Sequence, residues 1–152
     1  MRFLFSITLA ALVAFINSGA LFAHCEVPCG VYDDHARVHS IEEHCTTIEK
    51  AMAQIVENTA VAKSQSEVSQ AAQQAVRWVM TKEEHATKIQ TICSQYFLTQ
   101  RIKPGQADYH RKLELLHGIM VAAMKTKQTV EPDHVKKIRG LLGDFEKLYF
   151  SK

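Results

Sequence analysis

Apolar side chains recur every three or four residues along most of the chain after residue 33. Over residues 34–57 the steps between them are 3, 4, 3, 4 and 3 residues, which places them all on one helical face. The residues of this face are Val38, Ile41, Cys45, Ile48, Met52 and Ile55. The spacing predicts an amphipathic helix over 34–57 whose apolar face packs in a core.

The same periodicity predicts three further helices. The second covers about 66–100, and its middle, TKEEHATK, is polar, so the helix there is exposed, interrupted near Thr81, or facing something other than a core. Lys103-Pro104-Gly105 ends it, because proline and glycine together stop helices. The third covers about 107–126, and Pro132 fits the first turn of the fourth. The apolar stripes are Val68, Ala72, Ala75, Val79, Ile89, Ile92, Cys93, Tyr96 and Phe97 in the second helix; Leu113, Leu116, Ile119, Met120 and Ala123 in the third; and Val135, Ile138, Leu141 or Leu142, Phe145 and Leu148 in the fourth.

Four amphipathic helices joined by short links predict an all-α protein, an antiparallel four-helix bundle over residues 34–152. Cys45 and Cys93 fall on the apolar faces, where a free cysteine behaves as a small hydrophobic residue. A disulfide between them would require their two helices to be neighbours. We expect both cysteines in the core.

Residues 1–23 have the pattern of a cleavable export signal, with Arg2 before an apolar stretch and Ala23 directly before His24. The apolar stretch is shorter than the about 20 residues that a spanning helix needs, which favours cleavage over an uncleaved anchor. Ala20 is a second candidate for the cut. Removal of 23 of the 152 residues by signal peptidase would leave a 129-residue exported protein, secreted, periplasmic or in an organelle lumen.

The charge of the chain gives little attraction for nucleic acid. Loss of Arg2 lowers the formal net charge from +2 to +1, and no basic block or aromatic-basic stripe is present in the sequence. Export suggests an oxidising compartment, in which four cysteines would ordinarily indicate two disulfides.

The candidate chemistry lies in the irregular segment His24-Cys25-Glu26-Val27-Pro28-Cys29-Gly30-Val31-Tyr32-Asp33, residues 24–33. If cleavage makes His24 the amino terminus, it offers an α-amine and an imidazole, while Cys25 offers a backbone amide and a thiolate. Cys29 adds a second thiolate. Two nitrogen and two sulfur donors in one plane favour Ni(II) or Cu(II) over the tetrahedral Zn(II). Such anionic donors make a trivalent state accessible, so the pattern indicates one-electron chemistry.

Three further residues of this segment support such a site. Pro28 restricts the backbone and can turn the chain so that Cys29 lies beside Cys25. Gly30 tolerates a positive φ where the segment ends. Tyr32 could place its hydroxyl over the open face of the metal and donate to an incoming anion.

The pattern H-C-x-x-P-C-G-x-Y-D resembles the amino-terminal hook of the nickel-containing superoxide dismutases. The resemblance implies a four-helix bundle that assembles as a homohexamer, with one nickel ion per subunit. It implies disproportionation of superoxide to oxygen and hydrogen peroxide through a Ni(III)/Ni(II) cycle. It also implies roles for particular residues: His24, Cys25 and Cys29 as metal ligands, Tyr32 as the gate to the axial position, Pro28 as the turn, and Tyr96 as support for the gate.

The chain departs from the family pattern at several positions. Asp34 stands where a proline often follows the hook, and Glu26 stands where aspartate is common. Some members brace the axial imidazole with a glutamate and an arginine. Here His39 stands where that glutamate is expected, and His85 or Arg77 stands near the place of the arginine. The ligand set therefore transfers from the resemblance, whereas the residues that orient the ligands do not.

Two other functions remain open from the sequence. The first is an exported helical protein that binds a partner and contains a structural Cys25–Cys29 disulfide. The second is a copper- or zinc-binding protein that uses His24, Cys25, Cys29 and a further histidine such as His35 or His39. The metal bound by a protein with a free His24 terminus would distinguish these functions from the dismutase.

Overall fold

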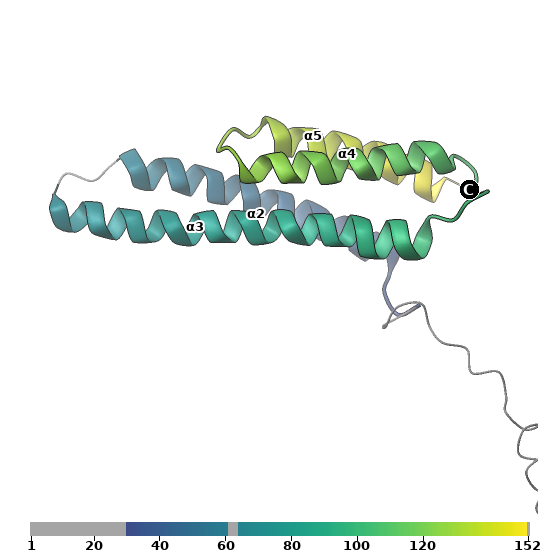
Figure 1. The fold of residues 1–152 in the computed structure, drawn as a ribbon, viewed down its shortest axis with the longest axis horizontal. Helices are drawn as coiled ribbons and strands as arrows, with labels where there is room; N and C mark the ends of the chain where they lie inside the picture. The colour runs from purple at the N-terminus through teal and green to yellow at the C-terminus, as the bar shows by residue number, and fades with distance from the viewer. Residues whose placement is uncertain (1–29, 61–63, 152) are drawn as a thin grey trace, which may run out of the picture. The chain divides into compact units, whose positions relative to one another are not determined.

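The computed structural model describes residues 30–60 and 64–151, and these residues form helices joined by short loops (Figure 1). Helix α2 spans Asp34–Ala60, α3 spans Gln65–Thr91, and α3 continues into a π-helix, η1, over Ile92–Arg101. Helix α4 spans Tyr109–Lys127, and α5 spans Asp133–Phe150. No helix in this part of the chain is both long and apolar enough to cross a membrane. The predicted export signal lies outside the described residues.

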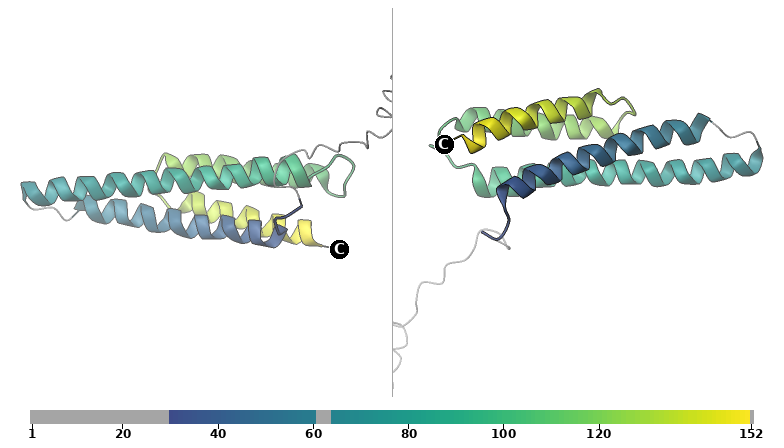
Figure 2. Two further views of the ribbon diagram at one scale, coloured as in Figure 1. Left: turned by 90° about the horizontal axis from the view of Figure 1, so that it is seen from below. Right: turned by 180° about the vertical axis from the view of Figure 1, so that it is seen from behind.

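The helices form two antiparallel hairpins that pack against each other. Helices α2 and α3 make one hairpin and α4 and α5 make the other (Figure 2). Helix α3 also contacts α4, and α2 contacts α5, so each helix has two neighbours around a central core. This arrangement confirms the predicted four-helix bundle.

The buried residues come from all four predicted stripes. Phe97 lies at the centre of an aromatic group in which its ring centre is 5.0 Å from that of Phe145 and 5.6 Å from that of Tyr149. Such edge-on aromatic pairs add stability beyond the area that they bury. The largest fully buried side chains are Phe97, Phe145, Ile41, Ile48, Ile89, Leu115, Leu116, Ile119, Ile138 and Val135.

Cys45 on α2 and Cys93 on η1 are both buried, and both are free thiols. Burial raises the pKa of each thiol to about 12. The prediction that they act as small core residues is therefore confirmed, and they are not joined by a disulfide in this structure. A buried thiol with so high a pKa is chemically inert near neutral pH.

The first half of the predicted stripe in 66–100 does not lie in the core. Val68, Ala72 and Val79 are exposed, because α4 and α5 are too short to cover this part of α3. Helix α2 has 27 residues and α5 has 18, so the α2–α3 hairpin extends past the other pair (Figure 1). The expectation that the apolar stripes lie in the core therefore holds only for the carboxyl-terminal part of this stripe.

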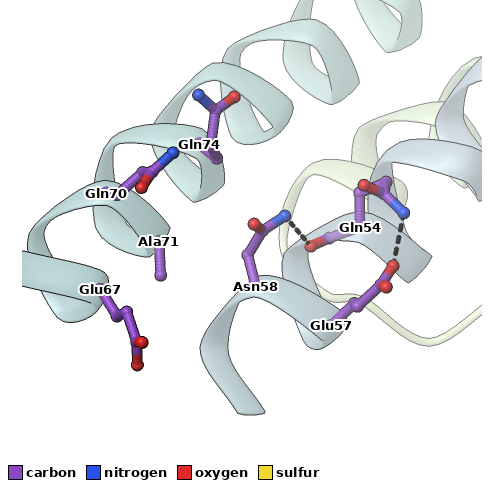
Figure 3. A pocket seen from close by; sticks show the side chains of 7 residues that line it. All are labelled: Gln54, Glu57, Asn58, Glu67, Gln70, Ala71 and Gln74. Carbon is purple, nitrogen blue, oxygen red and sulfur yellow. Dashed lines mark hydrogen bonds between the residues drawn. The ribbon is translucent and has the colours of Figure 1, made fainter. Parts of the chain in front are cut away.

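The projecting end of the hairpin is polar where α2 and α3 face each other. A cleft there is lined by Gln54, Glu57, Asn58, Glu67, Gln70, Ala71 and Gln74 (Figure 3). The Gln54 amide donates to Glu57, and the Asn58 amide donates to the Gln54 carbonyl, so these polar groups pair along their own helix. The end of the hairpin is therefore held by local contacts rather than by a core.

The polar middle of the second predicted helix does not interrupt it, and α3 runs continuously through Thr81. Lys82 is buried there, and its ammonium group donates to the carbonyl oxygens of Lys127 at 3.0 Å and Thr129 at 2.7 Å. These carbonyls lie where α4 ends and have no helical partner of their own. Lys82 therefore caps α4 and joins the two hairpins.

We expect Lys82→Met to lower the free energy of unfolding by about 1–3 kcal/mol, because two carbonyls near the buried end of α4 would lose their donor. Lys137→Met, at an exposed position on α5, is the control and should change stability by less than about 0.5 kcal/mol. Urea unfolding followed by circular dichroism measures both. Equal stabilities of the two variants would show that the cap contributes nothing.

Candidate metal centre

The predicted nickel ligands, His24, Cys25 and Cys29, lie outside the described residues, and so do Glu26 and Pro28 of the same segment. The structure describes how the chain is held directly after them, from Gly30 onward. Gly30 has a φ of +73°, a conformation that glycine adopts without strain and that the sequence analysis anticipated at this point.

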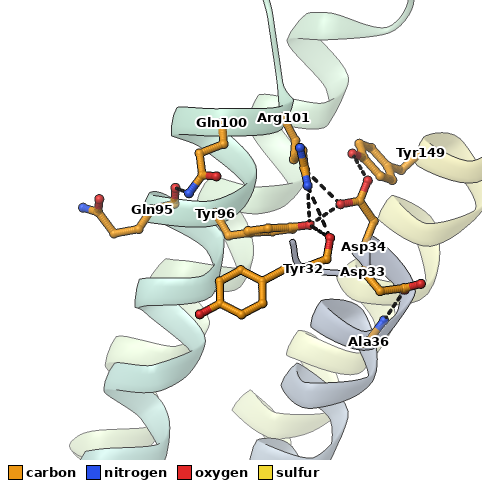
Figure 4. Close-up of polar contacts among 9 residues, drawn as sticks. All are labelled: Tyr32, Asp33, Asp34, Ala36, Gln95, Tyr96, Gln100, Arg101 and Tyr149. Atoms are coloured by element: carbon orange, nitrogen blue, oxygen red, sulfur yellow. Dashed lines mark hydrogen bonds and ion pairs between the residues drawn. The ribbon is translucent and has the colours of Figure 1, made fainter. Parts of the chain in front are cut away.

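Tyr32 is fixed through its backbone, while its side chain is 42% exposed. Its carbonyl oxygen accepts hydrogen bonds from the Tyr96 hydroxyl at 3.0 Å and from Arg101 Nη2 at 3.4 Å. The Arg37 guanidinium lies 4.6 Å from the centre of the Tyr32 ring. Figure 4 shows the phenol directed away from this cluster of polar groups.

The Asp34 carboxylate is the centre of the cluster that holds Tyr32 (Figure 4). Its Oδ1 accepts a short hydrogen bond from the Tyr96 hydroxyl and a bond of 2.9 Å from Arg101 Nε. Its Oδ2 accepts from the Tyr149 hydroxyl at 2.8 Å. Arg101 Nη2 also donates to the Tyr96 oxygen at 2.8 Å. One carboxylate thus joins the start of α2 to η1 and to α5.

Hydrogen bonding and charge together keep Asp34 ionised. Burial alone would raise its pKa, but hydrogen bonds from Tyr96 and Tyr149 and the charge of Arg101 outweigh burial and hold the pKa below its usual range. The pKa values of Tyr96 and Tyr149 are raised, by burial first and then by their bonds to this anion. Both phenols therefore remain protonated donors at neutral pH.

The π-helix explains how Tyr96 and Arg101 meet. Residues five apart lie on one face when the backbone bonds follow the i→i+5 pattern of a π-helix. The same spacing appears in the side-chain bonds of η1, where the Thr99 hydroxyl donates to the Ser94 carbonyl at 2.8 Å. Such segments are rare and often occur at functional sites. Here η1 brings an arginine and a tyrosine together on the Asp34 carboxylate.

The other predicted supporting residues lie elsewhere in the bundle. His39 is 74% exposed on α2, and its Nε2 lies 3.6 Å from Glu43. Arg77 donates to Gln74 on its own helix, and His85 faces His44. Of the predicted supports within the described residues, only Tyr96 contacts Tyr32.

Asp34, Arg101 and Tyr149 were not predicted as supporting residues. The departure from proline at position 34 was the one sequence signal that could have identified them. A charged residue directly after the hook requires partners of opposite charge or hydrogen-bond donors.

The fold and this cluster define an all-α bundle protein. Its amino-terminal segment contains a histidine and two cysteines, and it is followed by Tyr32, whose backbone is held by hydrogen bonds. A family model for nickel-containing superoxide dismutases matches residues 20–152, which include that segment and the whole bundle. No curated protein and no solved structure gives a significant match. The chain belongs to the nickel-containing superoxide dismutase family. It is an oxidoreductase with a nickel cofactor, and its substrate is superoxide.

We expect Asp34→Asn to lower the free energy of unfolding by about 2–3 kcal/mol at pH 7, because three donors lose an anionic acceptor. The folded pKa of Asp34 lies below its ordinary value of 3.8, so the contribution is complete above that value. It is lost as the pH falls through the folded pKa. The difference between the variant and the natural chain should therefore shrink in acid.

The control is Asp144→Asn, which removes an exposed carboxylate 3.7 Å from Lys147 and should cost less than about 1 kcal/mol. Urea unfolding of all three proteins from pH 7 down to about pH 3 provides the comparison. A cost of Asp34→Asn that stays constant over this range would show that the charge of the carboxylate is unimportant.

Proposed function

We propose that cleavage after Ala23 creates a nickel hook from residues 24–33, ahead of the bundle of residues 34–152. In this proposal His24 supplies its α-amine and imidazole, Cys25 its backbone amide and thiolate, and Cys29 a second thiolate. The observation that supports it most strongly is the family match from residue 20 onward, which contains this donor set. The donor types also fit a square-planar nickel ion better than a tetrahedral zinc ion.

The reaction converts two superoxide ions and two protons into oxygen and hydrogen peroxide. A nickel ion held by His24, Cys25 and Cys29 would supply the one-electron chemistry of this reaction through its Ni(III) and Ni(II) states. The residues around it have to admit a small anion, exclude larger reductants and supply protons.

Two observations support a role for Tyr32 in the reaction. The residue is 42% exposed, while its backbone carbonyl accepts hydrogen bonds from Tyr96 and Arg101. A phenol held by its own backbone can donate a hydrogen bond to an incoming anion without first being ordered. We infer that Tyr32 receives superoxide at the open side of the hook and that Asp34 fixes its position through Tyr96.

We further propose that residues 1–23 direct export and that signal peptidase removes them. The mature enzyme would then act outside the cell, in a periplasm or in an organelle lumen. This maturation also explains why the ligand set begins at the new terminus, since the α-amine of His24 becomes available only after the cut.

Adding one alanine before His24 of the mature chain tests the hook directly. The α-amine of His24 would become a peptide nitrogen, while every side chain and the bundle remain unchanged. We expect nickel to be lost or bound weakly and superoxide disproportionation to fall by at least about 10³-fold, because a ligand essential to the redox cycle is removed. Nickel content by elemental analysis and pulse-radiolysis kinetics measure the effect, with helicity checked by circular dichroism.

In the matched control, the added alanine is the last residue of a protease site. Cleavage after this alanine regenerates a free His24, which mass spectrometry confirms. Cleavage should restore nickel binding and activity in the same sample. An extended chain that keeps nickel and full activity would discard the hook. A chain whose cysteines form a Cys25–Cys29 disulfide, or that gains activity only with copper, would favour the alternative functions.

We also propose that the enzyme assembles as a homohexamer. The projecting part of the α2–α3 hairpin carries apolar side chains that α4 and α5 do not cover, among them Val76, 58% exposed, and Met80, 66% exposed. These two residues are four apart on α3 and share one face. Exposed apolar residues clustered in this way are typical of subunit interfaces.

We expect Met80→Glu to shift the species of about six chains toward smaller ones, because a charge would have to be buried at the contact. Met124→Glu is the matched control, since Met124 is also exposed but lies on α4. Sedimentation velocity of both variants reports the assembly. A hexamer that is unaffected by Met80→Glu would place the interface on another face.

A further inference from the structure

Two histidines from neighbouring helices face each other in the α2–α3 hairpin. Nδ1 of His44 on α2 lies 3.1 Å from Nδ1 of His85 on α3. The two ring centres are 4.8 Å apart, and the rings are inclined at 88° to each other. Neither residue contacts the Asp34 cluster, and the proposed hook does not use them.

The two Nδ1 atoms form a hydrogen bond when one of them carries a proton, and the same two distances also fit two imidazoles bound to one metal ion. A ring nitrogen lies about 1.15 Å from its ring centre, and an imidazole nitrogen binds a divalent metal at about 2.05 Å. For two such ligands, the observed separations of 3.1 Å and 4.8 Å correspond to an angle of about 98° at the ion, narrower than a tetrahedral angle. A linear N–H···N bond of the same nitrogen separation would place the centres about 5.4 Å apart. The observed pair matches the converging geometry.

The surroundings keep both lone pairs available to a cation. Burial is the first cause that lowers the pKa of each histidine; next, His85 lowers the pKa of His44, and the charge of Lys88 lowers the pKa of His85. Both rings are therefore mainly neutral at pH 7. Neutral imidazole is the form that binds zinc, copper and nickel.

The backbone on both sides of the pair is already fixed. Cys45 follows His44 and Ala86 follows His85, and both of these neighbours are fully buried between the helices. The two imidazoles therefore require little ordering before they bind an ion. A preformed pair loses less free energy on binding than two mobile side chains would.

The charges around the pair come from the same two helices. Glu43 and Glu84 favour a cation, while Arg37 and Lys88 oppose it. Lys88 is already paired with Glu84 at 2.7 Å, which reduces its repulsion of an ion. No group of three or more His, Cys, Asp or Glu side chains within the described residues converges on one point. The remaining ligands of an ion at this pair would therefore be water.

We propose that Nδ1 of His44 and Nδ1 of His85 form a second metal site in each chain, which binds a divalent transition-metal ion such as zinc or nickel. With two protein ligands and open positions, the site binds its ion exchangeably. It lacks thiolates, so it does not support the redox cycle proposed for the hook. The site thus differs from the hook both in its ligands and in its lability.

The test uses the full mature chain with the hook disabled by His24→Ala, Cys25→Ser and Cys29→Ser. Calorimetric titration with zinc, and separately with nickel, should show about one ion bound per chain. Changing His44 or His85 to glutamine in this background should weaken binding by more than about tenfold, since loss of even an outer-shell partner costs that much. Because the hook is absent, failure of this test leaves the dismutase proposal untouched.

The matched control is His110→Gln with His117→Gln, two exposed histidines on α4, and it should leave binding unchanged. A second readout needs no substitution at the pair: two-bond proton–nitrogen correlation spectra should show the Nδ1 resonances of both His44 and His85 shifting with one equivalent of zinc. Three outcomes would overturn the proposal. The chain without the hook ligands could bind no ion, its binding could survive loss of both histidines, or only the Nε2 resonances could respond to zinc.

Discussion

A single partly buried carboxylate joins the start of α2 to two other elements of the bundle. Asp34 is 29% exposed and therefore needs several donors to offset the loss of water around its charge. It finds them on two other elements, from Tyr96 and Arg101 of η1 and from Tyr149 of α5. Because Tyr96 and Arg101 also donate to the Tyr32 carbonyl, the interactions that stabilise the anion also fix the chain where the hook ends.

The periodicity of apolar residues predicted the helices well, but it did not predict how much of each helix is covered. All four helices occur, and residues such as Ile41 and Ile138 lie in the core as expected. Val68 and Val79 follow the same pattern and are nevertheless exposed. Periodicity reports that a helix has an apolar face, whereas burial depends on a partner of sufficient length. The short α4 and α5 determine where the core ends.

The candidate site was predictable only where its residues are contiguous. The hook donors lie within ten residues of one another, so their chemistry can be interpreted without a fold. The anchor combines residues 34, 96, 101 and 149, which only the folded chain brings together. A regular α-helix would place Tyr96 and Arg101 about 140° apart around its axis, since each residue turns by about 100°. Their contact depends on the π-helical register, which the apolar pattern did not indicate.

The four cysteines of the chain are divided between two roles by their environment. Cys45 and Cys93 are buried with pKa values near 12, so at neutral pH they are protonated thiols. A protonated thiol is not a ligand, because metals of this kind bind the thiolate. Burial therefore removes these two from competition for nickel. It leaves Cys25 and Cys29 as the remaining thiols of the chain, and these are the two that the proposed hook uses.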